Sequence, residues 1–335
     1  MRKIKKRGRN KRRTSTLVLL FVVFELTFTT ITGPFMLYYG PFKNVKTTVV
    51  GAAMTTYSLQ WLATTFLSKS AIAKIMSDQK VDALVQNNLD GVKIEKKDDN
   101  SIERYDIKGN KFKGYILIIS DPTRLKVGYS SMLGKEGQLT SDIAKDNNAI
   151  AAINGGGFRD EDNGSKWTGT GANPTGIIMA NGKIAFNNIT NANKKTEVVA
   201  MTKSGKLLVG IHSISEMQTA GVIDAVSFGP ALIVNGQKTI TKGDGGWGIA
   251  PRTAIAQRKD GAIILLVIDG RQAKSLGATL REVQDTLYDY GAFNASNLDG
   301  GSSSTLFYED EIINSPSDSL GERSVPSIMY IESRK

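Results

Sequence analysis

The segment 297–304 holds the residues with the clearest chemical potential. It reads Asn-Leu-Asp-Gly-Gly-Ser-Ser-Ser, with Asp299 as its acid. Glycines let a ligand approach main-chain N–H groups closely, and each hydroxyl can donate and accept hydrogen bonds. The pattern is typical of a polar binding site, although a plain Gly-Gly turn with a solvated aspartate is the alternative. The substrate-binding candidates in this segment are Asn297, Gly300, Gly301, Ser302 and Ser303.

Two other apolar runs end in a similar way. Residues 262–268 are followed by Asp-Gly-Arg, and residues 149–153 by Asn-Gly-Gly-Gly-Phe. Three polar residues at expected strand ends, each followed by glycine, favour one shared site over three unrelated turns. At these two ends the candidates are Asn154, Gly155, Gly156, Phe158, Asp269, Gly270 and Arg271.

A helix is expected between the two aspartates. Thr279 and Glu282 have the spacing of a capping box, and Gly291 is suited to the helix end. A strand–helix–strand unit can bring both strand ends to the edge where α/β sheets bind ligands. If the two strands are parallel, Asp269 and Asp299 face the same crevice.

Arg252 is the candidate cation. It lies near the start of an expected strand, which the glycine-rich residues 243–248 precede. A guanidinium held beside such a loop suits a phosphate or carboxylate ligand, and an ordinary ion pair is the alternative.

The composition excludes several other kinds of chemistry. The chain has no cysteine and a single histidine, His212, for which we expect a structural role. Thiol catalysis, Cys-ligated metals and His-cluster metal sites are therefore excluded, and no Gly-x-Ser-x-Gly elbow is present. Carboxylates remain. A pair of them, roughly 5–9.5 Å apart, is the signature of glycoside hydrolysis.

The N-terminal region has the pattern of a membrane anchor. Nine of the basic residues lie within residues 1–13, so the formal net charge of +11 belongs mainly to this tail, and nucleic-acid binding is not expected. The apolar stretch 17–39 is about 34 Å long as a helix, enough to cross a bilayer. The positive-inside rule places the tail in the cytoplasm and the remainder outside the cell membrane. A cleaved signal peptide is the alternative.

These observations predict an α+β fold with a mixed β-sheet core and flanking helices, preceded by one transmembrane helix. Asn181-Gly182 and Asn235-Gly236 each separate two apolar runs and predict hairpins, hence an antiparallel component. The expected segments are a basic cytoplasmic tail (1–16), the anchor (17–39), a membrane-proximal stalk or cap (40–113) and the main domain (114–335).

Several segments together resemble the phosphodiester glycosidase domain of the NAGPA, or uncovering-enzyme, type. The resemblance extends from Tyr115 onward and leaves the first hundred residues outside. The cysteines of the animal enzyme are absent. The segments that carry the resemblance are 151–158, 251–253, 267–272, 297–303, 314–318 and 321–323.

The resemblance implies a membrane-anchored extracytoplasmic hydrolase that cleaves the sugar C1–O bond of glycosyl-1-phosphodiesters in a surface glycan or phosphopolymer. Arg252 and Arg271 would stabilise the departing phosphate, and either Asp269 or Asp299 would be nucleophile or base. Asn154 and the serine hydroxyls would hold the sugar. No cofactor is firmly implied.

Two alternatives stay open. One is a non-catalytic glycan-binding or exopolysaccharide assembly factor, since fold does not fix function. The other is a metal-dependent phosphodiesterase in which the aspartates bind Mg²⁺ or Ca²⁺.

Overall fold

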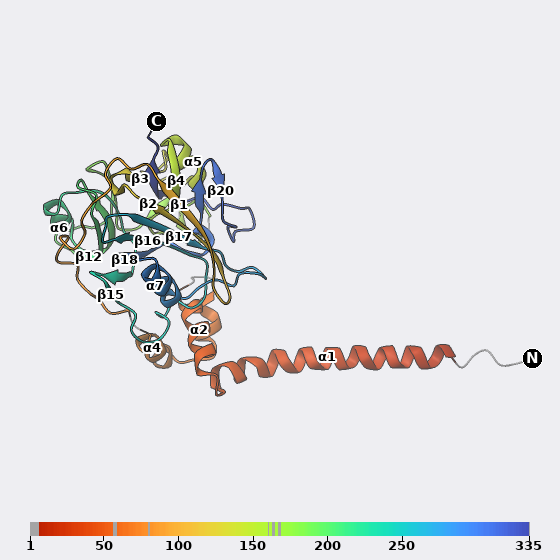
Figure 1. Ribbon diagram of the computed structural model, residues 1–335. Coiled ribbons are helices and arrows are strands. Elements are labelled where there is room, and N and C mark those ends of the chain that lie inside the picture. The colour runs from red at the N-terminus through yellow and green to blue at the C-terminus, as the bar shows by residue number, and fades with distance from the viewer. Residues whose placement is uncertain are drawn as a thin grey trace, which may run out of the picture. The chain divides into compact units, whose positions relative to one another are not determined.

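The computed structural model describes residues 7–55, 59–79, 81–159, 161–162, 165–166 and 169–334, with the backbone alone for 7–13, 161–162 and 165–166. It consists of two compact units, Met1–Ser77 and Asp78–Lys335 (Figure 1). The first six residues of the expected basic tail lie outside the described residues.

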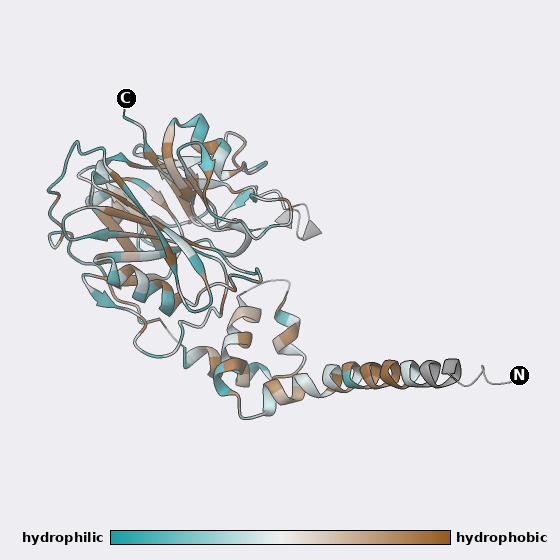
Figure 2. Ribbon diagram, turned by 45° about the vertical axis from the view of Figure 1, so that its right-hand side comes forward, coloured by the Kyte–Doolittle hydropathy of each residue, from teal (hydrophilic) through white to brown (hydrophobic). Residues whose placement is uncertain are grey.

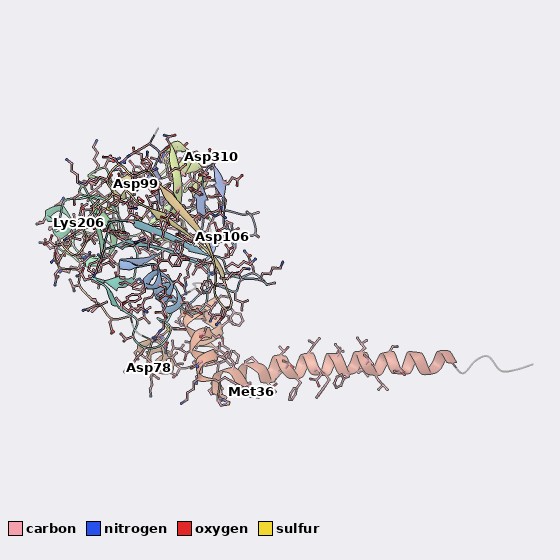
Figure 3. The ribbon with its side chains drawn as sticks, viewed as in Figure 1. Met36, Asp78, Asp99, Asp106, Lys206 and Asp310 are labelled. Atoms are coloured by element: carbon pink, nitrogen blue, oxygen red, sulfur yellow. The ribbon has the colours of Figure 1, made fainter. Side chains whose placement is uncertain are left out.

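The first unit is helical. A long apolar helix is followed by three short ones: α1 (Arg7–Tyr39), α2 (Lys43–Met54), α3 (Gln60–Thr64) and α4 (Lys69–Ser77). Thr14–Tyr39 is long and apolar enough to cross a membrane. Figure 2 shows the hydrophobic colouring along α1, and in Figure 3 its side chains project outward on all sides. Leu17 and Phe24, for example, are 67% and 60% exposed. The apolar surface of α1 is therefore not covered by the rest of the protein.

The second unit contains three large sheets. The largest has seven strands in the order β1 (Ile102–Lys108), β2 (Lys113–Ile119), β17 (Ile263–Ile268), β16 (Arg252–Arg258), β18 (Ala292–Leu298), β14 (Ala231–Val234) and β15 (Gln237–Lys238).

Two five-stranded sheets complete the core. One has the order β10 (Lys183–Asn187), β9 (Ile177–Ala180), β13 (Val222–Val226), β11 (Thr196–Thr202) and β12 (Leu207–His212). The other has the order β20 (Glu311–Ile312), β19 (Leu306–Tyr308), β4 (Ala149–Asn154), β21 (Ser327–Glu332) and β3 (Leu125–Tyr129). The two small hairpin-like sheets are β5 (Phe158–Arg159) with β8 (Asn173–Pro174), and β6 (Glu161–Asp162) with β7 (Ser165–Lys166).

Strand alternation divides the apolar residues between one central core and three outer ones. On β2, Leu117 and Ile119 join the central core, to which all three large sheets contribute. Ile116 and Ile118 lie on the other face, in an outer core with α7 (Leu280–Asp289). In the same way α6 (Ile214–Thr219) and α5 (Thr140–Asp146) pack against the outer faces of the two five-stranded sheets. The second unit is therefore three sheets around one core, each covered by a helix.

The local predictions around the two aspartates are confirmed. Thr279 and Glu282 form the capping box of α7, and Gly291 follows the helix with φ of +85°. Strands β17 and β18 both pair antiparallel to β16, so they run parallel to each other on either side of it. Their carboxyl ends consequently lie at the same edge of the seven-stranded sheet.

The α+β class is confirmed, with one difference in detail. Every pairing between described strands is antiparallel, so the parallel component exists only between strands separated by β16. The hairpins at Asn181-Gly182 and Asn235-Gly236 are present, and all four residues have the positive φ of a tight turn.

The segment 78–113 belongs to the second unit. Strand β1 forms one edge of the seven-stranded sheet. Gln86 Nε2 donates to Leu207 O at 3.0 Å, and Gln86 Oε1 accepts from Val209 N at 2.7 Å. The stretch expected as one membrane-proximal stalk or cap, 40–113, is thus divided at Ser77, because its second part supplies a strand and buried hydrogen bonds to the sheets.

Candidate active site at the edge of the seven-stranded sheet

Pro251 separates the two aspartate–glycine turns. Gly301 N donates to Pro251 O at 2.9 Å, and a Cβ on Gly270 would lie 2.6 Å from Pro251 N. A side chain at position 270 would clash with this main chain, so glycine is required for the close approach. The turns after β17 and β18 therefore pack on the start of β16.

Asn154 joins the third sheet to this edge. Its Nδ2 donates to Asp299 O at 2.6 Å, and its Oδ1 accepts from Thr253 Oγ1 at 2.8 Å and Thr305 N at 3.2 Å. The side chain is fully buried. Its hydrogen bonds go to protein groups, so the geometry favours a role in holding the Asp299 turn over direct contact with a sugar.

Asp299 is the acid with the most perturbed environment. It is only partly exposed, and burial raises the pKa of its carboxyl to about 6. The nearby Ser303 hydroxyl, the Arg323 guanidinium and the Gly300 N–H oppose the increase, although Ser303 Oγ has no hydrogen-bond partner among the described residues. A carboxyl that titrates near pH 6 can exchange a proton under physiological conditions.

Two arginines lie beside the Asp299 turn. The Arg323 guanidinium lies over the Phe158 ring at 4.8 Å and donates to Ser302 Oγ at 3.3 Å. Arg271 lies next to Gly301, where a Cβ would be 3.2 Å from its Nη2. Arg271 is exposed as a residue, but partial desolvation of its guanidinium and the charge of Arg323 lower its pKa. Such a pair is suited to an anionic ligand.

Glu322 fixes the loop that carries Arg323. Its two carboxylate oxygens accept from Ser141 Oγ at 2.6 Å and Ser141 N at 3.0 Å. The loop is thereby attached to the first turn of α5. Arg323 was not among the sequence candidates, although its segment was part of the family resemblance.

Arg252 is committed to the main chain. Its Nε donates to Ala278 O at 2.9 Å, and its Nη2 donates to Trp247 O at 3.1 Å and Gly248 O at 2.7 Å. It is 3% exposed, and burial lowers its pKa to about 10. These contacts favour a positioning role for Arg252, which holds the 243–248 loop, over the expected contact with phosphate.

Asp269 is also engaged within the protein. Its Oδ1 accepts from Asn314 Nδ2 at 3.2 Å and Ser315 N at 2.9 Å, and these two bonds oppose the increase of its pKa by burial. The residue is 3% exposed. Asp269 therefore holds the 314–315 segment, which in turn bonds Ser304 O.

The two aspartates leave the sheet toward different faces. Ile268, before Asp269, packs in the outer core under α7, whereas Leu298, before Asp299, packs in the central core. Because side chains alternate along a strand, the two carboxyls start on opposite sides. This arrangement does not favour the expected reacting pair, even though both turns lie at one edge.

The remaining candidates surround the same turns. Gly155 and Gly156 follow β4 and pack on Ser327, and Asn297 donates to Gly229 O at 3.1 Å. Four buried oxygens here have no hydrogen-bond partner among the described residues: Asn297 Oδ1, Ser303 Oγ, Ser304 Oγ and Thr305 Oγ1. Polar atoms of this kind are suited to bind water or ligand hydroxyls.

The described residues contain no group of three or more His, Cys, Asp or Glu side chains arranged to hold a metal ion. His212 is buried, and its Nε2 is 3.1 Å from Val209 O, with burial lowering its pKa. Its contacts are those of a core residue.

The model of the phosphodiester glycosidase family, NAGPA, matches residues 147–332, more than half of the chain. The chain belongs to the phosphodiester glycosidase family. The matched range includes the Asp299 turn, both arginines beside it and Asn154, so the site described above lies within the family domain.

Two relatives are similar over shorter segments. An uncharacterized protein of the SPbeta prophage of Bacillus subtilis is 40% identical over 81 residues, 24% of this chain and 12% of that protein. The N-acetylglucosamine-1-phosphodiester alpha-N-acetylglucosaminidase of Bos taurus is 37% identical over 70 residues, 21% of this chain and 13% of that enzyme. The chain thus spans a small part of these relatives.

Two solved structures share the fold. The catalytic domain of the zebrafish enzyme of the same name, auto-inhibited by its pro-peptide, has a TM-score of 0.58 and 23% identity over 72% of this chain and 87% of that one. An exported protein of Burkholderia pseudomallei has a TM-score of 0.50 and 16% identity over 66% and 74%.

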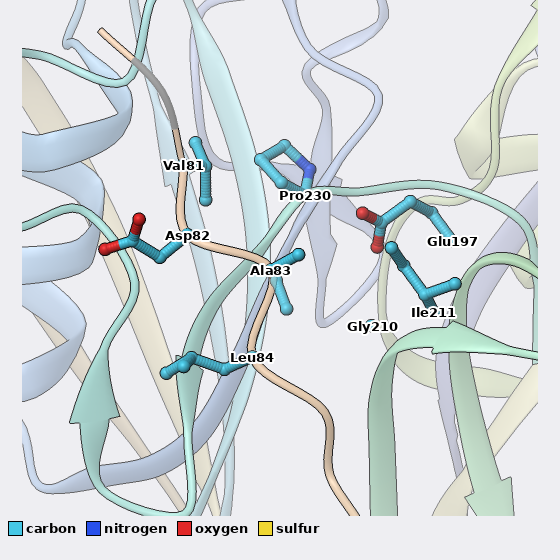
Figure 4. A pocket seen from close by; sticks show the side chains of 9 residues that line it. Val81, Asp82, Ala83, Leu84, Glu197, Gly210, Ile211 and Pro230 are labelled. Atoms are coloured by element: carbon cyan, nitrogen blue, oxygen red, sulfur yellow. The ribbon is translucent and has the colours of Figure 1, made fainter.

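A separate small cavity, of about 40 Å³, lies between the segment 81–84 and Glu197 (Figure 4). Burial raises the pKa of Glu197, and its Oε2 has no hydrogen-bond partner among the described residues. Asp82 also lines the cavity, but its carboxylate points away from Glu197. The volume admits water and not a sugar, so this cavity is not a reaction site.

Proposed function

We propose that this phosphodiester glycosidase hydrolyses the sugar C1–O bond of glycosyl-1-phosphodiesters. The observation that carries the proposal is the placement of one acid, Asp299, whose pKa is raised to about 6, beside the Arg271 and Arg323 guanidiniums. An acid and two cations at one turn match a substrate with an electrophilic carbon next to an anion.

The departing group explains why one acid is enough. Cleavage of the C1–O bond releases a phosphate monoester, which leaves as a stable anion and needs little protonation. Arg271 and Arg323 stabilise the charge on its oxygens. Water supplies a hydroxyl to C1 and a proton to the products.

Asp299 acts in its ionised form. Above pH 6 its carboxylate attacks C1 itself or removes a proton from the attacking water. Ser302, Ser303 and Ser304 supply hydroxyls for the sugar ring. Asp269, Asn154 and Arg252 hold the turns in place, a division of roles that differs from the carboxylate pair expected at first.

The substrate is a phosphate-linked glycan or surface polysaccharide, reached from the outer side of a cell membrane that α1 crosses once. The apolar span Thr14–Tyr39 supports this placement, and the basic residues before it favour a cytoplasmic N-terminus. A signal sequence passes the same test of length and composition.

Isotope-traced product analysis tests the reaction. The full chain in detergent is given α- and β-linked N-acetylglucosamine and glucose 1-phosphodiesters in H₂¹⁸O, with and without a chelator. Free reducing sugar carrying ¹⁸O, unaffected by chelator, supports the proposal. A phosphate product that carries ¹⁸O, and that no longer forms when chelator is present, identifies the metal-dependent phosphodiesterase. Binding of glycan without turnover identifies the non-catalytic assembly factor.

A further inference from the structure

The first unit folds back on the end of its long helix. The Phe66 ring stacks on Tyr38 with centroids 5.0 Å apart and meets Phe35 edge-on at 6.2 Å. Tyr38, Val50, Ala53, Ala63 and Ile72 form its buried cluster. Residues 40–77, here called the cap, are therefore a compact helical structure on the C-terminal end of α1 and not an extended stalk.

Four large apolar side chains of the cap are exposed. Phe42 is 51% exposed, Val45 is 52% exposed and Trp61 is 59% exposed. Leu59, at 39%, adds to the same set. Large apolar side chains so exposed on such a small unit call for a partner. Trp and Phe side chains of this kind are enriched where protein meets the boundary of a bilayer.

The charge of the cap has one sign. The sequence contains no Asp or Glu between Glu25 and Asp78, but it contains the four lysines Lys43, Lys46, Lys69 and Lys74. All except Lys46 are exposed. Exposed apolar side chains together with charges of positive sign alone match the headgroup layer of a bilayer with anionic lipids.

The charge also decides between partners. A second copy of the cap would bring lysines against lysines, with no acid on either cap to pair with them, and like charges oppose association. Lipid phosphates supply the missing anions. Direct continuity with the apolar span places the cap where such phosphates would be, at the end of Thr14–Tyr39.

We propose that the cap lies in the headgroup layer of the membrane that α1 crosses, with Phe42, Val45 and Trp61 inserted and the exposed lysines bound to anionic lipid phosphates. The inference rests on the proposed membrane placement of α1. If so, two parts of the chain bind the membrane: α1 crosses it and the cap lies in its headgroup layer.

The absence of cysteine makes a depth measurement direct. The full chain carrying Trp61→Cys with a nitroxide label is reconstituted in vesicles of phosphatidylcholine with one quarter phosphatidylglycerol. Collision with oxygen, which concentrates in lipid, is compared with collision with a water-soluble nickel chelate. Val23→Cys on α1 and Ser204→Cys in the second unit serve as the immersed and aqueous controls.

The expected result is a label at position 61 that is accessible to oxygen and shielded from nickel. Replacement of Lys43, Lys69 or Lys74 by Gln should lower its immersed-to-aqueous ratio about fivefold for each lysine. The same loss is expected in vesicles without phosphatidylglycerol, because the lysines then have no anionic headgroup to bind.

Three outcomes overturn the inference. A label at 61 as accessible to nickel as that at 204, with the label at 23 immersed, rejects the interfacial cap and leaves the anchor intact. Shielding from both reagents means that protein covers the cap. Aqueous labels at both 23 and 61 reject the membrane placement itself, together with this inference.

Discussion

The side-chain amide of Asn154 donates to the main-chain carbonyl of Asp299 at 2.6 Å, across 145 residues of sequence. This bond joins β4 of one sheet to the end of β18 of another. It fixes the turn that carries the Asp299 carboxyl and the serine hydroxyls of the candidate site. The geometry of the site therefore depends on contact between sheets, and each prediction below concerns a residue of this arrangement.

Replacing Asp299 with Asn should abolish turnover without lowering stability. The folded protein holds this carboxyl at a pKa of about 6 against an ordinary value of 3.8, so it binds more protons folded than unfolded between these values. Stability from this group is present below pH 3.8 and is lost as pH rises to 6. At pH 7 the free energy of unfolding of Asp299→Asn should exceed that of the wild type by up to about 3 kcal/mol, and near pH 3 the two should be equal. Denaturant titrations at both values measure this.

The pH dependence of kcat/KM should report the same carboxyl. Because Asp299 acts ionised, the rate constant should rise with pH and level off above about 6. Asp269→Asn serves as the control and should keep this inflection. A rate that declines above pH 6 would instead make Asp299 a general acid.

Arg271 and Arg323 should each increase kcat/KM for the phosphodiester substrate. Changing either to Gln removes a cation from the departing phosphate, and we expect a loss in kcat/KM of about 10²–10³. Arg258→Gln is the matched control, since Arg258 lies at the other end of β16 and pairs with Asp260. Equal losses in all three variants would show a general effect of charge and contradict specific binding.

We expect Asp269 to contribute to the stability of the fold and not to catalysis. Asp269→Ala leaves the Ser315 N–H and Asn314 amide without their acceptor, at a cost of about 1–3 kcal/mol in unfolding free energy. Asp269→Asn keeps an acceptor oxygen and should retain most of the stability and measurable turnover. Complete loss of activity in a stable Asp269→Asn protein would restore the two-carboxylate mechanism.

Arg252 should act through the 243–248 loop. Arg252→Gln removes donors to the carbonyls of Trp247, Gly248 and Ala278, so we expect lower thermal stability and faster protease cleavage within the loop. KM for the phosphodiester should change less than in Arg271→Gln. A large KM effect with an unchanged cleavage rate would indicate direct contact with substrate.

Local signals in the sequence were sufficient for many elements. The capping box of α7 and the two Asn-Gly hairpins depend on neighbouring residues only, and they form as predicted. These features require no knowledge of tertiary packing.

The facing of the site residues could not be predicted in this way. Residues 262–268 are apolar without alternation because β17 is buried on both faces, so the sequence does not reveal on which side Asp269 begins. Arg323 lies in a loop without periodicity. The inward hydrogen bonds of Asn154 and Arg252 depend on carbonyls supplied by distant segments.

The position of β21 between β3 and β4 constrains how the domain can be synthesised and folded. Arg124, just before β3, bonds Glu332 O on β21, 208 residues later. During synthesis, β3 and β4 therefore cannot pair with β21, the strand between them, until nearly all of the domain has been made. Folding is slow when many contacts join residues far apart in the sequence. Until β21 is in place, the unpaired edges of β3 and β4 can form hydrogen bonds with other strands or other chains. We therefore expect completion of this sheet, and with it the attachment of Gly155 to Ser327, to be one of the last events in the folding of the domain.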